Sequence, residues 1–103
     1  YEGSTALGPC LLILDQPLNP KTIIALKISR KGKVIFSGET SIAEIKRSFE
    51  ELISYLFLEL KFPQGCFLMT GTGIVPDDSF STLSQDEISI FIEGIGTLKN
   101  TVA

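Results

Sequence analysis

The stretch KTIIALKISRKGKVIFSGET, residues 21–40, decides the fold class of this chain. Its first half alternates large apolar side chains with small or polar ones, at Ile24, Leu26 and Ile28. A repeat of two residues is typical of a strand with one buried face. Lys31-Gly32 follows as a turn signal, and an apolar run resumes at Val34. Two extended runs around a short turn that contains glycine predict a β-hairpin.

A second hairpin is predicted at the other end of the chain, in EISIFIEGIGTLKNTVA, residues 87–103. Isoleucine occupies every second position from Ile88 to Ile92, which is again the period of a half-buried strand. Gly94 and Gly96 bracket a short reversal, and residues 97–102 resume an extended pattern. The chain therefore contains two strand pairs that can form one sheet.

The clearest helical pattern lies between them, in TSIAEIKRSFEELISYLFLELKFP, residues 40–63. Ser41 and Glu44 form an S-x-x-E capping box, and Pro63 should end the helix. The apolar positions at helical spacing are Ile42, Ile45, Phe49, Leu52, Ile53 and Leu56. We expect this helix to close one side of the sheet. The predicted class is α+β and β-rich, with two hairpins and one amphipathic helix.

Charged residues take the opposite side of this helical pattern: Glu44, Lys46, Arg47, Glu50 and Glu51. The three glutamates could be catalytic carboxylates. Charges that oppose an apolar stripe are more typical of a solvated helix face, which is the interpretation we favour.

A short apolar run from Cys66 to Met69 predicts a strand that leads into the loop Thr70-Gly71-Thr72-Gly73. Glycines let a ligand approach the backbone N–H groups closely, and the threonines add hydroxyls. The loop could therefore hold a carboxylate or a keto oxygen. Alternatively, it is a turn that needs glycine for its backbone angles. It matches neither G-x-G-x-x-G nor a P-loop, which disfavours nucleotide binding.

Two aspartates, Asp77 and Asp78, follow that loop. Adjacent acids can bind a hard cation through oxygen. Neighbouring aspartates after a proline are more often part of a turn or a helix cap, and we favour the turn.

Composition narrows the class of function. The 103 residues suit one small domain, and the net charge of −3 argues against a nucleic-acid partner. Arg30, Lys31 and Lys33 form the one basic cluster, which we interpret as a solvated hairpin tip, with a phosphate-binding patch as the alternative.

The sequence contains no histidine, so it cannot supply a Ser-His-Asp or Cys-His nucleophile. No apolar stretch approaches the length of a membrane span, and we expect no membrane partner.

The two cysteines, Cys10 and Cys66, each adjoin an apolar run. We expect buried free thiols, with a disulfide as the minor alternative, and this weakly favours a reducing cytoplasm. The chain begins with Tyr1 rather than Met, so we expect it to be part of a longer protein.

The C-terminal third resembles the end of the fumarylacetoacetate hydrolase family. The resemblance rests on Thr70-Gly71-Thr72 and on the later EGIGTLKN, residues 93–100, in that order and spacing. The opening YEGSTALGPC, residues 1–10, and the helical pattern before the loop are similar to the family in layout. Many members have proline after T-G-T, whereas this chain has Gly73 followed by IVPDD. That variant resembles the branch that removes water from 2-keto-3-deoxy sugar acids.

This resemblance implies a β-roll fold, in which residues 1–103 form the C-terminal portion of one catalytic domain. It implies a Mg²⁺ cofactor that stabilises an enolate of the substrate. It also implies that the carboxylate ligands of the metal, and a catalytic lysine just before Tyr1, lie upstream of this chain. No catalytic residue and no metal ligand is therefore assigned to the chain itself.

Within the chain, the resemblance implies substrate contacts at Thr72, Gly71 and Thr70, with Thr72 as the hydrogen-bond donor. Tyr1, Glu2 and Ser4 are possible pocket-lining residues, because they adjoin the implied lysine. The implied partners are a small 2-keto acid, the N-terminal remainder of the protein and further copies of it.

The implied reaction converts 2-keto-3-deoxyarabinonate to 2,5-dioxopentanoate, by a cytoplasmic hydro-lyase. Two alternatives stay open. The same fold could act as a C–C hydrolase, decarboxylase or isomerase on a keto acid, or the chain could be a non-catalytic binding domain. We expect the isolated 103 residues to be inactive.

Overall fold

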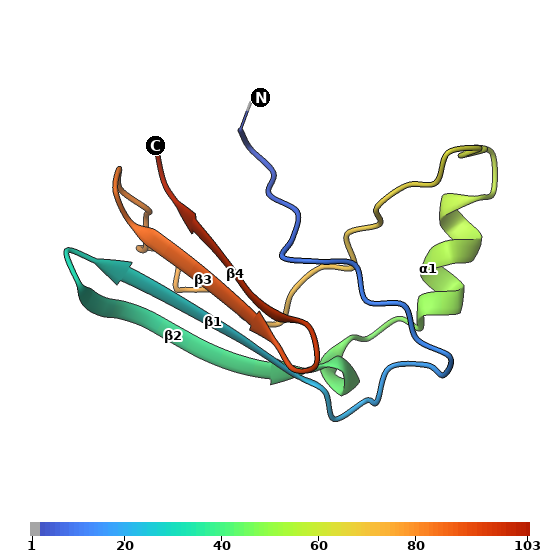
Figure 1. The fold of residues 1–103 in the computed structure, drawn as a ribbon, viewed down its shortest axis with the longest axis horizontal. Helices are drawn as coiled ribbons and strands as arrows, with labels where there is room; N and C mark the ends of the chain where they lie inside the picture. The colour runs from blue at the N-terminus through green and yellow to red at the C-terminus, as the bar shows by residue number, and fades with distance from the viewer. Residues whose placement is uncertain (1–2) are drawn as a thin grey trace.

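A computed structural model describes residues 3–103 of the chain. Four antiparallel strands form one sheet in the order β2-β1-β3-β4: β1 is Ile23–Arg30, β2 is Lys33–Ser41, β3 is Glu87–Ile92 and β4 is Gly96–Thr101. Figure 1 shows the two hairpins side by side, with β1 and β3 in the middle of the sheet. Both predicted hairpins are confirmed, and so is the β-rich α+β class.

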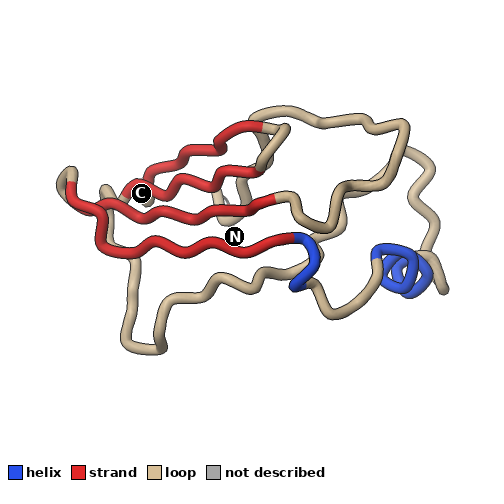
Figure 2. Tube along the Cα trace, turned by 90° about the horizontal axis from the view of Figure 1, so that it is seen from below, coloured by secondary structure: helices blue, strands red, loops and turns tan. Residues whose placement is uncertain are grey.

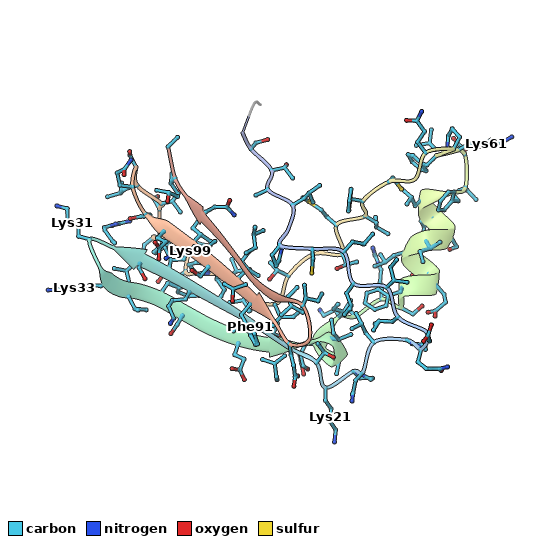
Figure 3. The ribbon with its side chains drawn as sticks, viewed as in Figure 1. Lys21, Lys31, Lys33, Lys61, Phe91 and Lys99 are labelled. Atoms are coloured by element: carbon cyan, nitrogen blue, oxygen red, sulfur yellow. The ribbon has the colours of Figure 1, made fainter. Side chains whose placement is uncertain are left out.

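The turn of the first hairpin brings Arg30 opposite Lys33, and the register of the two strands shifts once, between Ile28 and Ser29. Lys31 and Gly32 have φ angles of 50° and 76°, so both central residues are left-handed. A two-residue turn of this hand matches the natural twist of the strands on either side. Lys31 and Lys33 extend from this tip, as Figure 3 shows.

The strand register gathers the alternating apolar residues on one face of the sheet. Leu26 lies opposite Ile90 and Ile28 opposite Ile88 across the central pair. The loop after residue 70 crosses this face, where Ile28 and Ile74 are the buried hydrophobic residues, with 4% and 7% of their surface exposed. The small core therefore lies between the sheet and this loop.

Gly38 in β2 makes that close approach possible. A Cβ atom at this position would lie 2.5 Å from Cγ2 of Ile74, which is too close for real carbon atoms. Next to it, the rings of Phe36 and Phe80 pack with their centroids 6.0 Å apart. These two contacts fix the path of the loop over β2.

The opposite face of the sheet is polar. Lys99 Nζ lies 2.8 Å from Glu87 Oε2 in an exposed ion pair between β4 and β3. Figure 3 shows Lys99 and Phe91 over this part of the sheet, and Phe91 is an exposed aromatic residue among these charges.

The predicted helix is shorter than the sequence pattern suggested. A 3-10 turn, η1, covers Ile42–Glu44, and the α-helix α1 covers only Phe49–Leu56, so the prediction that the helix continues to Pro63 is wrong. The expected Ser41 cap is also wrong, because its side chain makes no capping hydrogen bond. The backbone N–H groups of Ile42 and Ala43 donate instead to Thr22 O and Pro20 O, at 3.2 and 2.9 Å.

A later S-x-x-E pair performs the capping. Ser48 Oγ accepts a hydrogen bond from the backbone N–H of Glu51 at 3.1 Å, and Ser48 is the N-cap of α1. Between the two helical pieces Ile45 is extended, with φ −73° and ψ 116°. The chain therefore turns away from the sheet before the α-helix begins.

The helix does not close the sheet, and this expectation is wrong. Figures 1 and 2 show α1 beyond one end of the sheet rather than over a face. None of its residues is buried, and Ile53 is exposed despite its place in the apolar stripe. The apolar side of α1 has no strand beneath it within residues 3–103.

Two expectations about the remaining apolar runs are also wrong. Residues 66–69 form no strand, and Phe67 and Met69 are exposed, because no strand of the sheet pairs with this segment. Cys10 and Cys66 are exposed free thiols rather than buried ones. No helix in the part of the chain that the structure describes is long and apolar enough to cross a membrane.

An ion pair between the fully buried Asp86 and the partly exposed Arg30 joins the two hairpins. Arg30 Nε and Nη2 donate to Asp86 Oδ1 and Oδ2 at 2.8 and 2.7 Å. Asp86 is fully buried, and its Oδ2 also accepts the Leu83 backbone N–H at 2.8 Å. Arg30 Nη2 donates further to Ser81 O at 3.0 Å. The pair ties the end of β1 to the turn that begins β3, so Arg30 does not belong to a solvated basic tip.

This arrangement predicts a loss of stability in acid. The hydrogen bonds from Arg30, and then from the Leu83 N–H, lower the pKa of Asp86 to about 2 from its ordinary 3.8. A carboxyl whose pKa is lower in the folded state stabilises the fold above its unfolded pKa, and that contribution is lost as pH falls from about 4 to 2. Denaturant unfolding of the full-length protein between pH 5 and 2 should show this slope. Asp86→Asn should remove it, and an unchanged slope in Asp86→Asn would contradict the assignment.

Candidate functional site

The Thr70–Gly73 loop has a defined conformation. Gly71 has a φ of 89°, a left-handed angle that side chains disfavour, so glycine is required here by the backbone. Thr72 Oγ1 accepts the Ile74 backbone N–H at 3.0 Å, and lies 3.4 Å from Ile74 O. The hydroxyl thus closes a local turn through its acceptor lone pairs.

Strand β2 packs against the residues that follow Thr72 and holds them in place. Ile74 is buried over Gly38, and the α-carbon of Gly73 lies so near β2 that an added Cβ would be 3.3 Å from Thr40 Oγ1. A rigid strand therefore positions the two residues that follow Thr72.

The loop forms one wall of a cavity of about 630 Å³ at the end of the sheet. Its apolar lining includes Ile24 of β1 and Ile92 of β3, and the first turn of α1 contributes Phe49. Thr70, Gly71, Thr72 and Gly73 all line it, so the structure brings the predicted substrate-contact residues together. Their role as a cradle stays a prediction.

The cavity also has charged residues from the segment between η1 and α1. Glu44, Lys46 and Arg47 line it together with the loop. Arg47 Nε lies 3.9 Å from Glu51 Oε1, at the limit of an ion pair, whereas no carboxylate of residues 3–103 lies within ion-pair distance of Lys46.

Sequence reasoning missed these cations because it placed them on a solvated helix face. The signal that could have found them is the second S-x-x-E pair, Ser48 to Glu51. A helix that starts at Ser48 leaves Lys46 and Arg47 on the linker before it.

Other candidates from the sequence lie elsewhere. Ser4 is exposed and is not part of this cavity lining, and Tyr1 and Glu2 fall outside the described residues. Asp77 Oδ1 accepts the Ser79 backbone N–H at 2.9 Å and the Ser79 hydroxyl as well, and these bonds lower the pKa of Asp77. The turn interpretation of these aspartates is thus confirmed. Residues 3–103 contain no group of three or more side chains that could hold a metal ion.

Comparison with known proteins found two similar enzymes. The chain is 35% identical over 103 residues to a probable 2-keto-3-deoxyxylonate dehydratase from Haloferax volcanii, covering 99% of the chain and 36% of that protein. It is 39% identical over 99 residues to a 2-dehydro-3-deoxy-D-arabinonate dehydratase from Saccharolobus solfataricus, covering 95% of the chain and 33% of that protein. The chain spans about a third of the length of these relatives.

Solved structures agree with this similarity. A 2-keto-3-deoxy-D-arabinonate dehydratase complexed with magnesium and 2,5-dioxopentanoate superposes with a TM-score of 0.79 and 37% identity, over 86% of this chain and 31% of that one. A hexagonal crystal form of 2-keto-3-deoxyarabinonate dehydratase gives 0.78 and 40%, over 82% and 30%.

The family comparison covers the whole chain. The family described as fumarylacetoacetate (FAA) hydrolase C-terminal matches residues 1–103. Together with the two dehydratase relatives, this match shows that the chain belongs to the fumarylacetoacetate hydrolase family.

Proposed function

We propose that this chain is part of a Mg²⁺-dependent dehydratase that converts 2-keto-3-deoxyarabinonate to 2,5-dioxopentanoate and water. The observation that carries the proposal is the identity of 35% and 39% to two dehydratases of 2-keto-3-deoxy sugar acids over nearly all of the chain. The cavity lined by Thr70 to Gly73 supports it, because a loop of hydroxyls and backbone N–H groups suits a keto acid rich in oxygen.

In this proposal the Thr72 hydroxyl donates a hydrogen bond to the substrate. The oxygen already accepts the Ile74 N–H at 3.0 Å, which orients the hydroxyl. Its alternative acceptor Ile74 O lies 3.4 Å from Thr72 Oγ1, so that hydrogen bond is weak. A substrate carboxylate or keto oxygen is a better acceptor. Gly71 and Thr70 form the adjoining wall of the site.

The metal would be held by another part of the protein. The related structure contains magnesium, whereas residues 3–103 offer no cluster of side chains that fits a metal ion. We therefore assign no step of the reaction to a metal bound by these residues. We place the ligands, and the catalytic lysine, in the remainder of a protein about three times as long.

Exposed apolar surface supports a covering partner. Leu11, Ile13, Phe57, Phe67 and Met69 are each at least half exposed. Exposed apolar side chains in this number favour a contact with another part of the protein. We propose that the remainder of the same chain covers it, within a cytoplasmic homo-oligomer.

Incubation of the full-length protein with Mg²⁺ and 2-keto-3-deoxyarabinonate tests the function. We expect 2,5-dioxopentanoate to accumulate, EDTA to stop its formation, and the isolated 103 residues to produce none. Full-length protein that forms no dioxo acid would refute the dehydratase. Release of carbon dioxide, or cleavage of an acylpyruvate instead, would assign one of the other reactions of this fold.

A further inference from the structure

Lys46 lies in the lining of the cavity beside the predicted substrate loop. It follows Ile45, whose extended backbone ends the 3-10 turn, and precedes Ser48, whose side chain caps α1. The cavity that it lines is the one lined by Thr70, Gly71 and Thr72. The interruption of the helix therefore places a cation in the lining of the cavity that the loop's hydroxyls and backbone also line.

Lys46 and Arg47 both line the cavity, and within residues 3–103 Lys46 is the one of the two without a carboxylate within 4.0 Å. The Nε atom of Arg47 lies 3.9 Å from Oε1 of Glu51, at the limit of an ion pair. Glu44 lines the same cavity, yet it makes no ion pair within 4.0 Å among residues 3–103. Within the same residues Lys46 also has no carboxylate partner, so a ligand anion need not displace one.

The surroundings favour binding of an anion at this point. Lys46 is exposed, but Ile24, Ile92 and Leu52 line the same cavity, and an apolar lining strengthens attraction between charges relative to open water. A lysine ammonium acts as a compact point charge with three rotatable donors. It can reach a carboxylate without the fixed planar geometry that a guanidinium demands.

We propose that Lys46 binds the carboxylate of the 2-keto acid and selects acids over uncharged analogues. This inference rests on the proposed function, in which a 2-keto acid occupies the cavity. Lys46 is a specificity residue in this scheme, and Thr72 serves a different oxygen of the ligand. The carboxylate is thus held from the α1 side and the keto group from the loop side.

A comparison of two ligands on two proteins tests the inference. Pyruvate and pyruvamide differ in the charge of one group, and both can be titrated by calorimetry into the full-length protein with Mg²⁺. Wild type should prefer pyruvate, and Lys46→Met should lose about tenfold or more in affinity for pyruvate and little for pyruvamide. Lys46→Arg should recover part of the loss. Lys61→Met is the matched control, because Lys61 is not among the residues that line the cavity and lies beyond the C-terminal end of α1, as Figure 3 shows.

Kinetics provide a second measurement. Removal of binding that is equal in the ground and transition states raises KM and leaves kcat unchanged. Lys46→Met should follow this pattern with 2-keto-3-deoxyarabinonate. Lys46→Gln replaces it if the methionine variant does not fold, as judged by its melting curve.

The outcomes separate the two proposals. Turnover by wild type with equal pyruvate affinity in Lys46→Met would overturn the role of Lys46 and leave the dehydratase standing. An equal loss for both ligands would also overturn it, because that result indicates a structural effect. Absence of dioxo acid with pyruvate binding that depends on Lys46 would refute the dehydratase and support carboxylate recognition.

Discussion

Replacement of Asp86 by alanine in the full-length protein should lower the denaturant midpoint several times more than loss of an exposed ion pair. Asp86 is fully buried and accepts two hydrogen bonds from Arg30 and one from the Leu83 N–H. Alanine would leave the guanidinium and that N–H without their acceptor. Removal of one partner from a buried ion pair is strongly destabilising, and here the partner removed is the fully buried one, whereas the Arg30 side chain is 32% exposed.

Glu87→Ala is the matched control. It breaks the exposed pair between Lys99 and Glu87, which is the next residue after Asp86 and the first residue of β3, and exposed pairs contribute little to stability. Equal midpoints for the two variants would contradict the structural role of Asp86. The double variant Arg30→Met, Asp86→Leu should be more stable than Asp86→Ala, because it leaves no unpaired charge in the interior.

Thr72→Val should produce the largest loss of activity among substitutions in the loop. Valine keeps the shape of threonine and removes the hydroxyl, and an unsatisfied buried partner costs about 1–3 kcal/mol, which is roughly 5- to 150-fold in kcat/KM. Turnover of 2-keto-3-deoxyarabinonate by the full-length enzyme measures this effect.

The Thr72 hydroxyl also accepts the Ile74 N–H, so the valine variant disturbs the loop as well. Thr72→Ser keeps the hydroxyl and separates the two effects, and it should retain most of the activity. Thr97→Val, on the exposed side of β4, is the control for loss of a threonine hydroxyl as such. Full activity in Thr72→Val would assign the hydroxyl to loop structure alone.

The hairpins could be predicted because their signals are local. The alternation from Ile24 to Ile28 and the Lys31-Gly32 turn lie within a few residues of one another, and so does the second pattern near Ile90. Period-2 patterning and turn residues act over the range that a strand pair spans.

The helix start could not be predicted from such signals. Two S-x-x-E pairs, at Ser41 and at Ser48, compete for the role of cap. The choice depends on whether the N–H groups of Ile42 and Ala43 find other acceptors, and those acceptors, Thr22 and Pro20, lie twenty or more residues earlier. Tertiary hydrogen bonds therefore determine which of the two S-x-x-E pairs caps the helix, and they cannot be read from the local sequence.

In the candidate site, too, the local features could be predicted from the sequence and the tertiary contacts could not. The Thr70–Gly73 loop is visible in sequence, but its position next to Lys46 depends on that late helix start. Arg30 and Asp86 are separated by 56 positions, and each looks like an ordinary surface charge in its own segment. Pairing of distant charges leaves no periodic trace in a single sequence.

The contact of Gly38 with Ile74 also limits which substitutions the two positions can accept during evolution. The backbone angles of Gly38 do not demand glycine, but a methyl group there would occupy the space of the isoleucine. The side chains at the two positions therefore compete for the same space, and a larger residue at position 38 requires a smaller residue at position 74. A library that randomises position 38 alone should return glycine, whereas a library that randomises both positions should also return pairs with a larger residue at 38 and a smaller one at 74.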